Sequence, residues 1–218
     1  MTDNNHVMNE QPIHKLGDVS IVLGQKDSGK SVLLEHLLMG MESYVIIDPL
    51  DDHYPPGSLD IYSPAELREA LKRGQSKCVI KEPFDDEERL TEYLQVAAHY
   101  ERLHLIIDEA NLFMNAHACP DILEKWAQFQ VSHSDCAMIL AARQAKHIHD
   151  AVYSQADNYY VFYYGSHEDS KFQSLPISRE HKDQIQELDP FHFLYKRNSA
   201  RFNKPYVNDP VPLPDHMQ

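Results

Sequence analysis

The sequence predicts an α/β protein with three layers, in which helices cover both faces of a mostly parallel sheet. Short apolar runs alternate with segments of helical periodicity through most of the 218 residues, as parallel sheets with crossover helices require. Several runs are apolar throughout, which is typical of strands buried on both faces. The length suits one large domain rather than two, and 42% hydrophobic with 25% charged residues is an ordinary globular composition.

The expected elements follow from this alternation. Strands are predicted at residues 19–24, 44–48, 77–81, 103–108, 136–142 and 158–164, with a late strand at 191–196. Helices are predicted at residues 30–41, 64–73, 85–100, 121–130 and 177–188. Ser63 followed by Pro64 is a favourable start for the second helix. From Pro205 onward, four prolines and no periodicity predict an extended or disordered segment.

The charge excludes one class of function. With 20 basic and 34 acidic residues the net charge is −14, which argues against a protein that coats nucleic acid non-specifically. The charge is uneven, however, because residues 191–204 hold four basic residues and no acidic one. Any contact with a phosphate backbone is therefore expected to be local.

Targeting and redox signals are also informative. No apolar run approaches the roughly 18 residues that a membrane span needs, and the polar N-terminus lacks the apolar core of a signal peptide, so we expect a protein that is not secreted. The three cysteines form no C-x-x-C pair and are expected to be free thiols in a reducing compartment. The histidines lack the spacing of a zinc site.

A phosphate-binding loop is indicated by residues 24–31, GQKDSGKS, which fit the pattern G-x-x-x-x-G-K-S. The glycines permit a tight turn and close backbone approach, so that main-chain N–H groups point at phosphate oxygens. The loop follows an apolar strand and opens a helix, the context that the pattern requires. Lys30 would neutralise the β- and γ-phosphates of ATP, and the Ser31 hydroxyl would bind Mg²⁺. The predicted nucleotide-binding residues are Gly24, Gln25, Lys26, Asp27, Ser28, Gly29, Lys30, Ser31 and Val32.

A carboxylate pair ends the strand at 103–108, in the segment LIIDE. Asp108 at the strand end is expected to reach Mg²⁺ through water. Glu109 follows directly, and a second carboxylate there can orient and deprotonate the attacking water. Alone, the pair is equally well explained as the end of a strand in an acidic protein, but the phosphate loop favours the catalytic interpretation. Asp48 also ends a strand, and either helps to position water or metal or belongs to a turn before Pro49.

The order of these parts favours one division of the phosphate-loop enzymes, the ATP-hydrolysing ring motors. In that division an additional strand separates the phosphate-loop strand from the aspartate strand, and residues 136–142 are the candidate. Arg143 and Gln144 end it, so one of them is expected near the γ-phosphate as a sensor, the alternative being a solvated strand end. The prediction is thus a three-layer P-loop NTPase fold of the additional-strand, catalytic-glutamate type. Its parts are a polar arm at residues 1–16, the ATPase domain at 17–204 and a short proline-rich C-terminal extension at 205–218.

Five segments of the chain together resemble a known family. They are IVLGQKDSGKS, YVIIDPLDDH, LIIDEAN, SHSDCAMILAARQ and ADNYYVFYYG, and they occur in the order found in the FtsK/HerA superfamily of DNA-pumping ATPases. The compact chain looks most like the genome-packaging ATPases of membrane-containing icosahedral viruses. The resemblance covers residues 19–165.

The resemblance implies a function, a site and partners. It implies an ATP-hydrolysing motor that translocates double-stranded DNA and packages a viral genome into a preformed capsid. The implied catalytic set is Lys30, Ser31, Asp108 and Glu109, with Arg143 or Gln144 as sensor. Such subunits work as homo-oligomeric rings, often hexamers, with DNA in the central channel. The implied partner is a capsid or membrane-vertex protein, and the implied location is the host cytoplasm and the packaging vertex of the virion.

Two sets of basic residues follow from this interpretation. The expected DNA contacts are Lys146, Lys196, Arg197 and Arg201, for which an ordinary solvated face is the alternative. Many superfamily members also carry Gly-Arg-His before the fourth strand, where the arginine acts on the ATP of the neighbouring subunit. The matching positions here are Val131, Ser132 and His133, so another cation must act. Arg102 is expected at the opposite sheet edge and Arg89 in an ion pair. Arg179, Arg197 and Arg201 remain as candidates, and Arg179 is the favoured substitute.

Two other functions stay open on the sequence. A nucleotide-dependent switch or assembly factor would bind ATP and a protein partner without pumping DNA, and an acidic surface with a proline-rich tail suits it. A small-molecule kinase would need an arginine-rich lid over the phosphates, and the segment after Gln144 has no arginine cluster. Stimulation of hydrolysis by DNA or by a protein partner distinguishes the motor from the switch.

Overall fold

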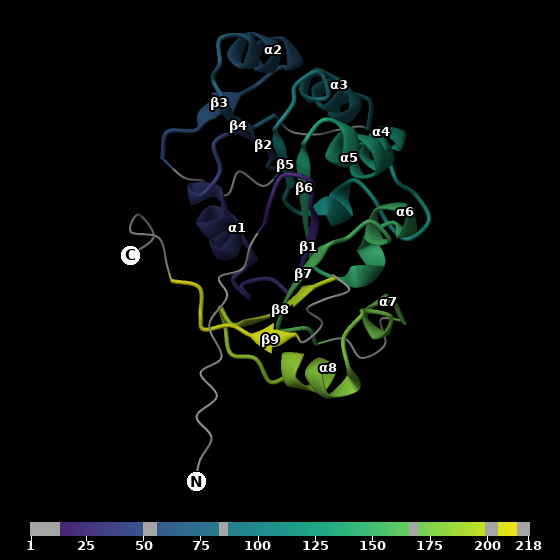
Figure 1. Ribbon diagram of the computed structural model, residues 1–218. Helices are drawn as coiled ribbons and strands as arrows, with labels where there is room; N and C mark the ends of the chain where they lie inside the picture. The colour runs from purple at the N-terminus through teal and green to yellow at the C-terminus, as the bar shows by residue number, and fades with distance from the viewer. Residues whose placement is uncertain (1–13, 50–55, 83–86, 166–169, 199–204, 213–218) are drawn as a thin grey trace.

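The computed structural model describes residues 14–49, 56–82, 87–165, 170–198 and 205–212. Its centre is one nine-stranded sheet in the order β3-β4-β2-β5-β6-β1-β7-β8-β9 (Figure 1). The strands from β1 to β7 pair in parallel, whereas β8 and β9 complete one edge in antiparallel pairs. The strands are β1 (Val19–Leu23), β2 (Tyr44–Ile47), β3 (Leu59–Ile61), β4 (Lys77–Ile80), β5 (His104–Ile107), β6 (Ala137–Ala142), β7 (Asn158–Phe162), β8 (Phe193–Arg197) and β9 (Tyr206–Val207).

Helices connect most of these strands, as the alternation of the sequence predicts. The helices are α1 (Lys30–Met39), α2 (Pro64–Lys72), α3 (Glu87–Ala97), α4 (Asp121–Lys125), α5 (Val131–His133), α6 (Asp150–Tyr153), α7 (Ser170–Gln173) and α8 (Arg179–Ile185), with single turns η1 (Ala110–Leu112) and η3 (Ala145–His147). A π-helical segment, η2 (Trp126–Gln130), joins α4 to α5. The helix predicted at 121–130 therefore runs on to His133. Ser63 caps α2 as expected, because its side chain accepts a hydrogen bond from the Glu66 N–H.

Two apolar clusters lie on opposite faces of the sheet. Successive residues of a strand point to opposite sides, so Ile21 of β1 joins the cluster under α2, α3 and α4, while Val22 joins the cluster under α1. Figure 1 shows α1 on one side of the sheet and the helices from α2 to α6 on the other. The three-layer α/β prediction is confirmed. No helix of the described residues has the length and apolarity to cross a membrane.

The sheet order confirms the additional strand. β6 pairs with β5 on one side and with β1 on the other, in parallel both times. The segment CAMILAA thus separates the phosphate-loop strand from the strand that ends at Asp108, as predicted. Because the strands are parallel, their carboxyl ends meet at one edge of the sheet, which places the loops after β1, β5 and β6 together.

Two strands were not predicted. β3 has three residues and only Ile61 is buried, so the segment has too little apolar pattern to be recognised as a strand. β9 has two residues and lies in the segment predicted to be an extended or disordered tail. Its pairing with β8 is a property of tertiary structure that the residues after Pro205 do not reveal.

Candidate nucleotide-binding and hydrolysis site

The phosphate loop occupies the turn between β1 and α1, and its two glycines are required for different reasons. Gly29 is the N-cap of α1 at φ 110°, a conformation that residues with a Cβ rarely adopt. Gly24 is limited by space, because an added Cβ would lie 2.5 Å from Ser28 Oγ and 2.7 Å from Phe162 Cβ. The loop can therefore keep this shape only with glycine at both positions.

Lys30 is held inside the curve of the loop. It is buried, and its Nζ donates a hydrogen bond to the Gln25 carbonyl at 3.0 Å. Burial lowers its pKa, an effect that the nearby charges of Glu109 and Asp108 oppose and that of Arg143 reinforces. The structure thus brings the loop lysine, the carboxylate pair and Arg143 into one electrostatic cluster.

The other predicted loop residues divide by exposure. Gln25, Lys26 and Asp27 at the tip are exposed, whereas Ser28 and Val32 are buried. Ser31 is partly buried in the first turn of α1. The exposed tip is the part of the loop that is open to a ligand, and the buried part fixes its position on the fold.

Asp108 and Glu109 follow β5 in a tight turn. Both are buried, with 3% and 8% exposure, and the Glu109 N–H donates to Asp108 Oδ1 at 2.9 Å. Glu109 has a left-handed backbone, with φ 51° and ψ 49°. A left-handed backbone is uncommon outside glycine, and strained residues of this kind cluster at functional sites. The two adjacent carboxylates have different partners, because Asp108 accepts from the backbone of this turn and Glu109 accepts from Arg143.

Arg143 holds the Glu109 carboxylate. It follows β6, and its Nε lies 3.1 Å from Oε1 and 3.0 Å from Oε2 of Glu109. The Arg143 side chain is 46% exposed while that of Glu109 is 10% exposed, so the guanidinium reaches inward from the surface. Gln144 is partly buried beside it. Of the two sensor candidates, the structure brings Arg143 into contact with the predicted base.

The oxygen donors at this edge fit a hard divalent cation. Mg²⁺ binds through one or two protein oxygens and keeps several waters, and a Ser31 hydroxyl with an Asp108 carboxylate is such a set. Asp48 has another partner, because Lys81 Nζ lies 3.1 Å from its Oδ2. Both residues are buried or nearly so and directly follow β2 and β4. The sequence left the role of Asp48 open, and the ion pair with Lys81 is what the structure shows.

The predicted DNA contacts do not form one group. Lys146 is exposed on η3, near the edge that carries Arg143. Arg197 pairs with Asn158, the first residue of β7, and therefore lies at the amino ends of the parallel strands, opposite the phosphate loop. It also contacts Asp18 at 3.4 Å. Lys196 is only 3% exposed, so the prediction that it offers an accessible cation is wrong. Lys196 lies in β8 opposite Tyr159 of β7, and its burial there lowers its pKa. Arg201 lies outside the described residues.

The arginine candidates are distributed largely as expected. Arg89 is paired with Glu82 and Glu92 at 2.7 and 2.6 Å, and Arg102 precedes β5 at the edge opposite the phosphate loop. Arg179 is exposed at the start of α8, which Ser178 caps. Ser132 and His133 are exposed on α5.

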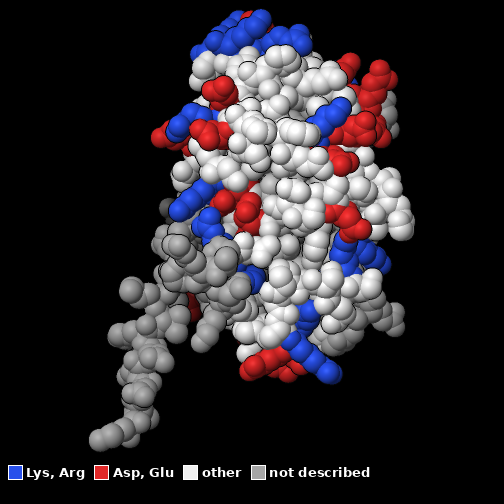
Figure 2. Space-filling view, turned by 45° about the vertical axis from the view of Figure 1, so that its right-hand side comes forward, with Lys and Arg blue, Asp and Glu red and all other residues white. Residues whose placement is uncertain are grey.

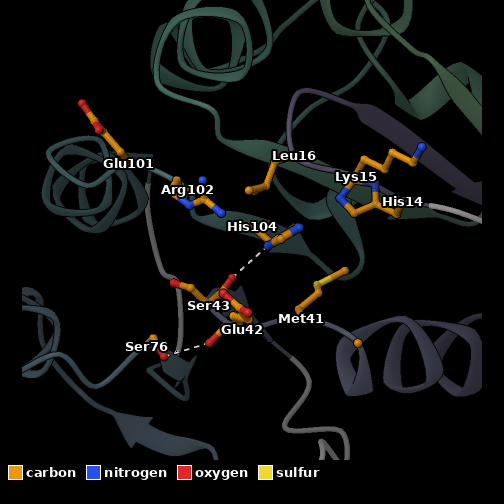
Figure 3. Close-up of a pocket in the computed structure, with 11 residues that line it drawn as sticks. His14, Lys15, Leu16, Met41, Glu42, Ser43, Ser76, Glu101, Arg102 and His104 are labelled. Atoms are coloured by element: carbon orange, nitrogen blue, oxygen red, sulfur yellow. Dashed lines mark hydrogen bonds between the residues drawn. The ribbon is translucent and has the colours of Figure 1, made fainter.

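A pocket of about 660 Å³ lies at the amino ends of the parallel strands, on the side of the sheet opposite the phosphate loop (Figure 3). His14 and His104 pack there with ring centroids 5.3 Å apart, and the His104 ring nitrogen bonds the Ser43 carbonyl. Burial lowers the pKa of His14 to about 3. Because Arg102, His104 and Ser43 stand at or before the amino ends of β5 and β2, this pocket is separate from the candidate nucleotide site.

Sheet order, phosphate loop and carboxylate pair together define the fold of a P-loop ATPase of the additional-strand type. Solved structures show which proteins have this fold. The genome-packaging NTPase B204 from Sulfolobus turreted icosahedral virus 2, in complex with sulfate, is 22% identical over 92% of this chain and 100% of that chain, with a TM-score of 0.74. The DNA-packaging ATPase B204 from Sulfolobus turreted icosahedral virus is 19% identical over 90% of this chain and 99% of that chain, with a TM-score of 0.72.

A more distant likeness extends beyond viruses. VirB4 of Thermoanaerobacter pseudethanolicus is 10% identical over 92% of this chain and 91% of that chain, with a TM-score of 0.61. The sequence matches no family model and no curated protein. The resemblance drawn from the sequence is therefore confirmed at the level of the fold, and the roles of the site residues stay predictions.

Proposed function

We propose that the protein is an ATP-hydrolysing motor that translocates double-stranded DNA and packages a viral genome into a preformed capsid. The observation that carries the proposal is the contact of Arg143, at the end of the additional strand, with Glu109 in a cluster that includes Lys30 and Asp108. A fold likeness that spans the whole of one B204 chain supports it, and another structure of that NTPase holds ATP-gammaS.

The chain's own residues account for binding and hydrolysis. Loop N–H groups and Lys30 bind the β- and γ-phosphates. Mg²⁺ held by Ser31, and by Asp108 through water, would neutralise charge on those phosphates. Glu109 takes the proton of the attacking water. Both carboxylate oxygens face Arg143 Nε in this structure, and we propose that the guanidinium moves away from Glu109 when ATP binds. The same guanidinium can then turn to the γ-phosphate, which suits a sensor.

DNA contact by this chain must be local. The net charge is −14, and Figure 2 shows Lys and Arg on the viewed face in separate groups interleaved with Asp and Glu. A ring of subunits compensates, because it repeats a small group of cations around a channel. We include in the proposal a homo-oligomeric ring, a capsid or membrane-vertex protein that docks it, and a location at the packaging vertex and in the host cytoplasm.

The test of this function is ATP hydrolysis by the full chain with and without duplex DNA, measured beside the native mass. We expect a ring-sized mass and a rate that duplex DNA increases. Lys146→Ala and Arg197→Ala, made separately, should reduce the stimulated rate and leave the basal rate unchanged. Equal loss of both rates would place the residue in the nucleotide site or the fold. Hydrolysis that ignores DNA and responds to a protein partner would favour a nucleotide-dependent switch.

A second prediction concerns the cation that acts between subunits. Arg179 is exposed, and we propose that it reaches the γ-phosphate of the neighbour's ATP, where it would neutralise developing charge. Arg179→Ala and Lys30→Ala chains should each be inactive alone. Mixing them should restore part of the activity, because some interfaces then pair an intact loop with an intact arginine. Normal hydrolysis by Arg179→Ala alone would refute this role.

A further inference from the structure

Residues 205–212 lie beside β8 and are linked to the phosphate loop through Phe191. Residues 205–212, here called the C-terminal strap, contain β9, which pairs antiparallel with β8 (Figure 1). Beyond β9, the Asn208 N–H donates to the Phe193 carbonyl at 2.9 Å. The strap thus runs along β8 toward Phe191, the residue two positions before that strand.

Phe191 joins the strap to the phosphate loop. Its N–H donates to the Ser28 carbonyl at 3.0 Å, and its own carbonyl accepts from the Val211 N–H at 3.1 Å. It also lies against Gly29, because a Cβ added to that glycine would be 3.0 Å from both Cα and Cδ1 of Phe191. One residue therefore contacts both the loop that begins α1 and the end of the strap.

The backbone of Phe191 has a conformation that aromatic residues avoid. Its φ is +67°, in the left-handed region where a bulky side chain is costly. Such a conformation persists only where the surroundings fix it. Phe191 is the third residue of a turn in which the His192 N–H donates to the Asp189 carbonyl at 3.2 Å, and this turn accommodates a positive φ. The other fixing contacts are its own two hydrogen bonds and the packing of Val211, which is 7% exposed in the apolar cluster that includes Val32 and Phe162.

We propose that Phe191 is a positioning residue for the phosphate loop and that the C-terminal strap holds it in place. The loop must present its N–H groups to phosphate oxygens in a fixed arrangement. Ser28 and Gly29 directly precede Lys30, so a shift of their backbone also moves the lysine and the first turn of α1. The inference rests on the proposed nucleotide binding. The coupling is reciprocal: if the docked strap raises the affinity for nucleotide by some factor, bound nucleotide raises the docking equilibrium constant of the strap by the same factor.

The test compares two valines of the strap in the full chain. Val211→Asp places a charge in the apolar cluster and should release Phe191, whereas Val207→Asp changes a side chain on a residue that is 42% exposed. We expect Val211→Asp to raise the Kd for Mg-ATPγS by about 5- to 150-fold, the usual range for coupled sites. It should also raise the KM for ATP more than it lowers kcat. Val207→Asp should match the unmodified chain.

If Val211→Asp fails to fold, a milder variant and a measurement on the unmodified chain still test the inference. Val211→Ala should raise the Kd in the same direction by less, and Mg-ATPγS should slow hydrogen exchange at residues 208–211. An unchanged Kd in both Val211 variants, or exchange that ignores the nucleotide, would overturn the inference alone. A chain that binds no Mg-ATPγS at all would overturn the proposed function and this inference with it.

Discussion

Lys30→Ala should remove tight ATP binding. Lys30 is buried, and its ammonium group lies inside the curve of the phosphate loop, where it donates to the Gln25 carbonyl. Truncating one partner of a desolvated charge pair costs about 2–5 kcal/mol, which is roughly 30-fold to several thousandfold in Kd. Titration with Mg-ATPγS measures the change, and circular dichroism with thermal unfolding checks that the variant folds.

A matched control separates this effect from a general loss of positive charge. Lys72→Ala removes an exposed lysine from α2 that is paired with Glu69 on the surface, and its Kd should equal that of the unmodified chain. A folded Lys30→Ala chain that binds Mg-ATPγS as tightly as the unmodified chain would show that the loop is not the phosphate site.

Glu109→Gln should separate binding from turnover. Glutamine keeps the shape and can still accept a hydrogen bond from Arg143, but it cannot take a proton from water. General-base catalysis contributes about 10²–10⁴-fold, so kcat should fall by roughly 100-fold or more while the Kd for ATP stays near that of the unmodified chain. Single-turnover hydrolysis with the enzyme in excess is the measurement, because it isolates the chemical step.

The control for Glu109 is a glutamate at the other edge of the sheet. Glu101 lines the pocket beside Arg102 and is exposed, so Glu101→Gln should leave kcat unchanged. If Glu109→Gln hydrolysed ATP at the unmodified rate, Glu109 would be a buried strand-end carboxylate that Arg143 satisfies, and the base would have to be sought elsewhere.

The sequence predicted those parts of the site whose structure depends on a short, continuous run of residues. A glycine loop between an apolar strand and a helix has few other conformations, and the buried run before Asp108 requires a central strand. The position of β6 between β5 and β1 came from the order of the motifs. That order also placed Arg143 or Gln144 near the γ-phosphate, whereas the contact of Arg143 with Glu109 was not predicted and comes from the structure.

The parts that escaped prediction depend on tertiary contacts. Phe191 looks like the first residue of a strand in the sequence, whereas in the structure it lies in the turn from Asp189 to His192, and nothing local indicates its bond to Ser28. β9 is too short to carry a periodicity. Lys196 looked exposed because it lies in a basic run, yet its place in β8 buries it. The sequence shows charge but does not show which side of a late strand faces the protein.

Translocation itself tests the central claim most directly. A third strand annealed to one end of a duplex is displaced only by a motor that moves along the DNA, and its release can be followed by fluorescence. We predict that the full chain releases the strand with Mg-ATP, and that neither Mg-ATPγS with the full chain nor Mg-ATP with Glu109→Gln does so at a comparable rate. ATP hydrolysis that duplex DNA stimulates, without release of the strand on any duplex tested, would contradict the account of this protein as a DNA-translocating motor.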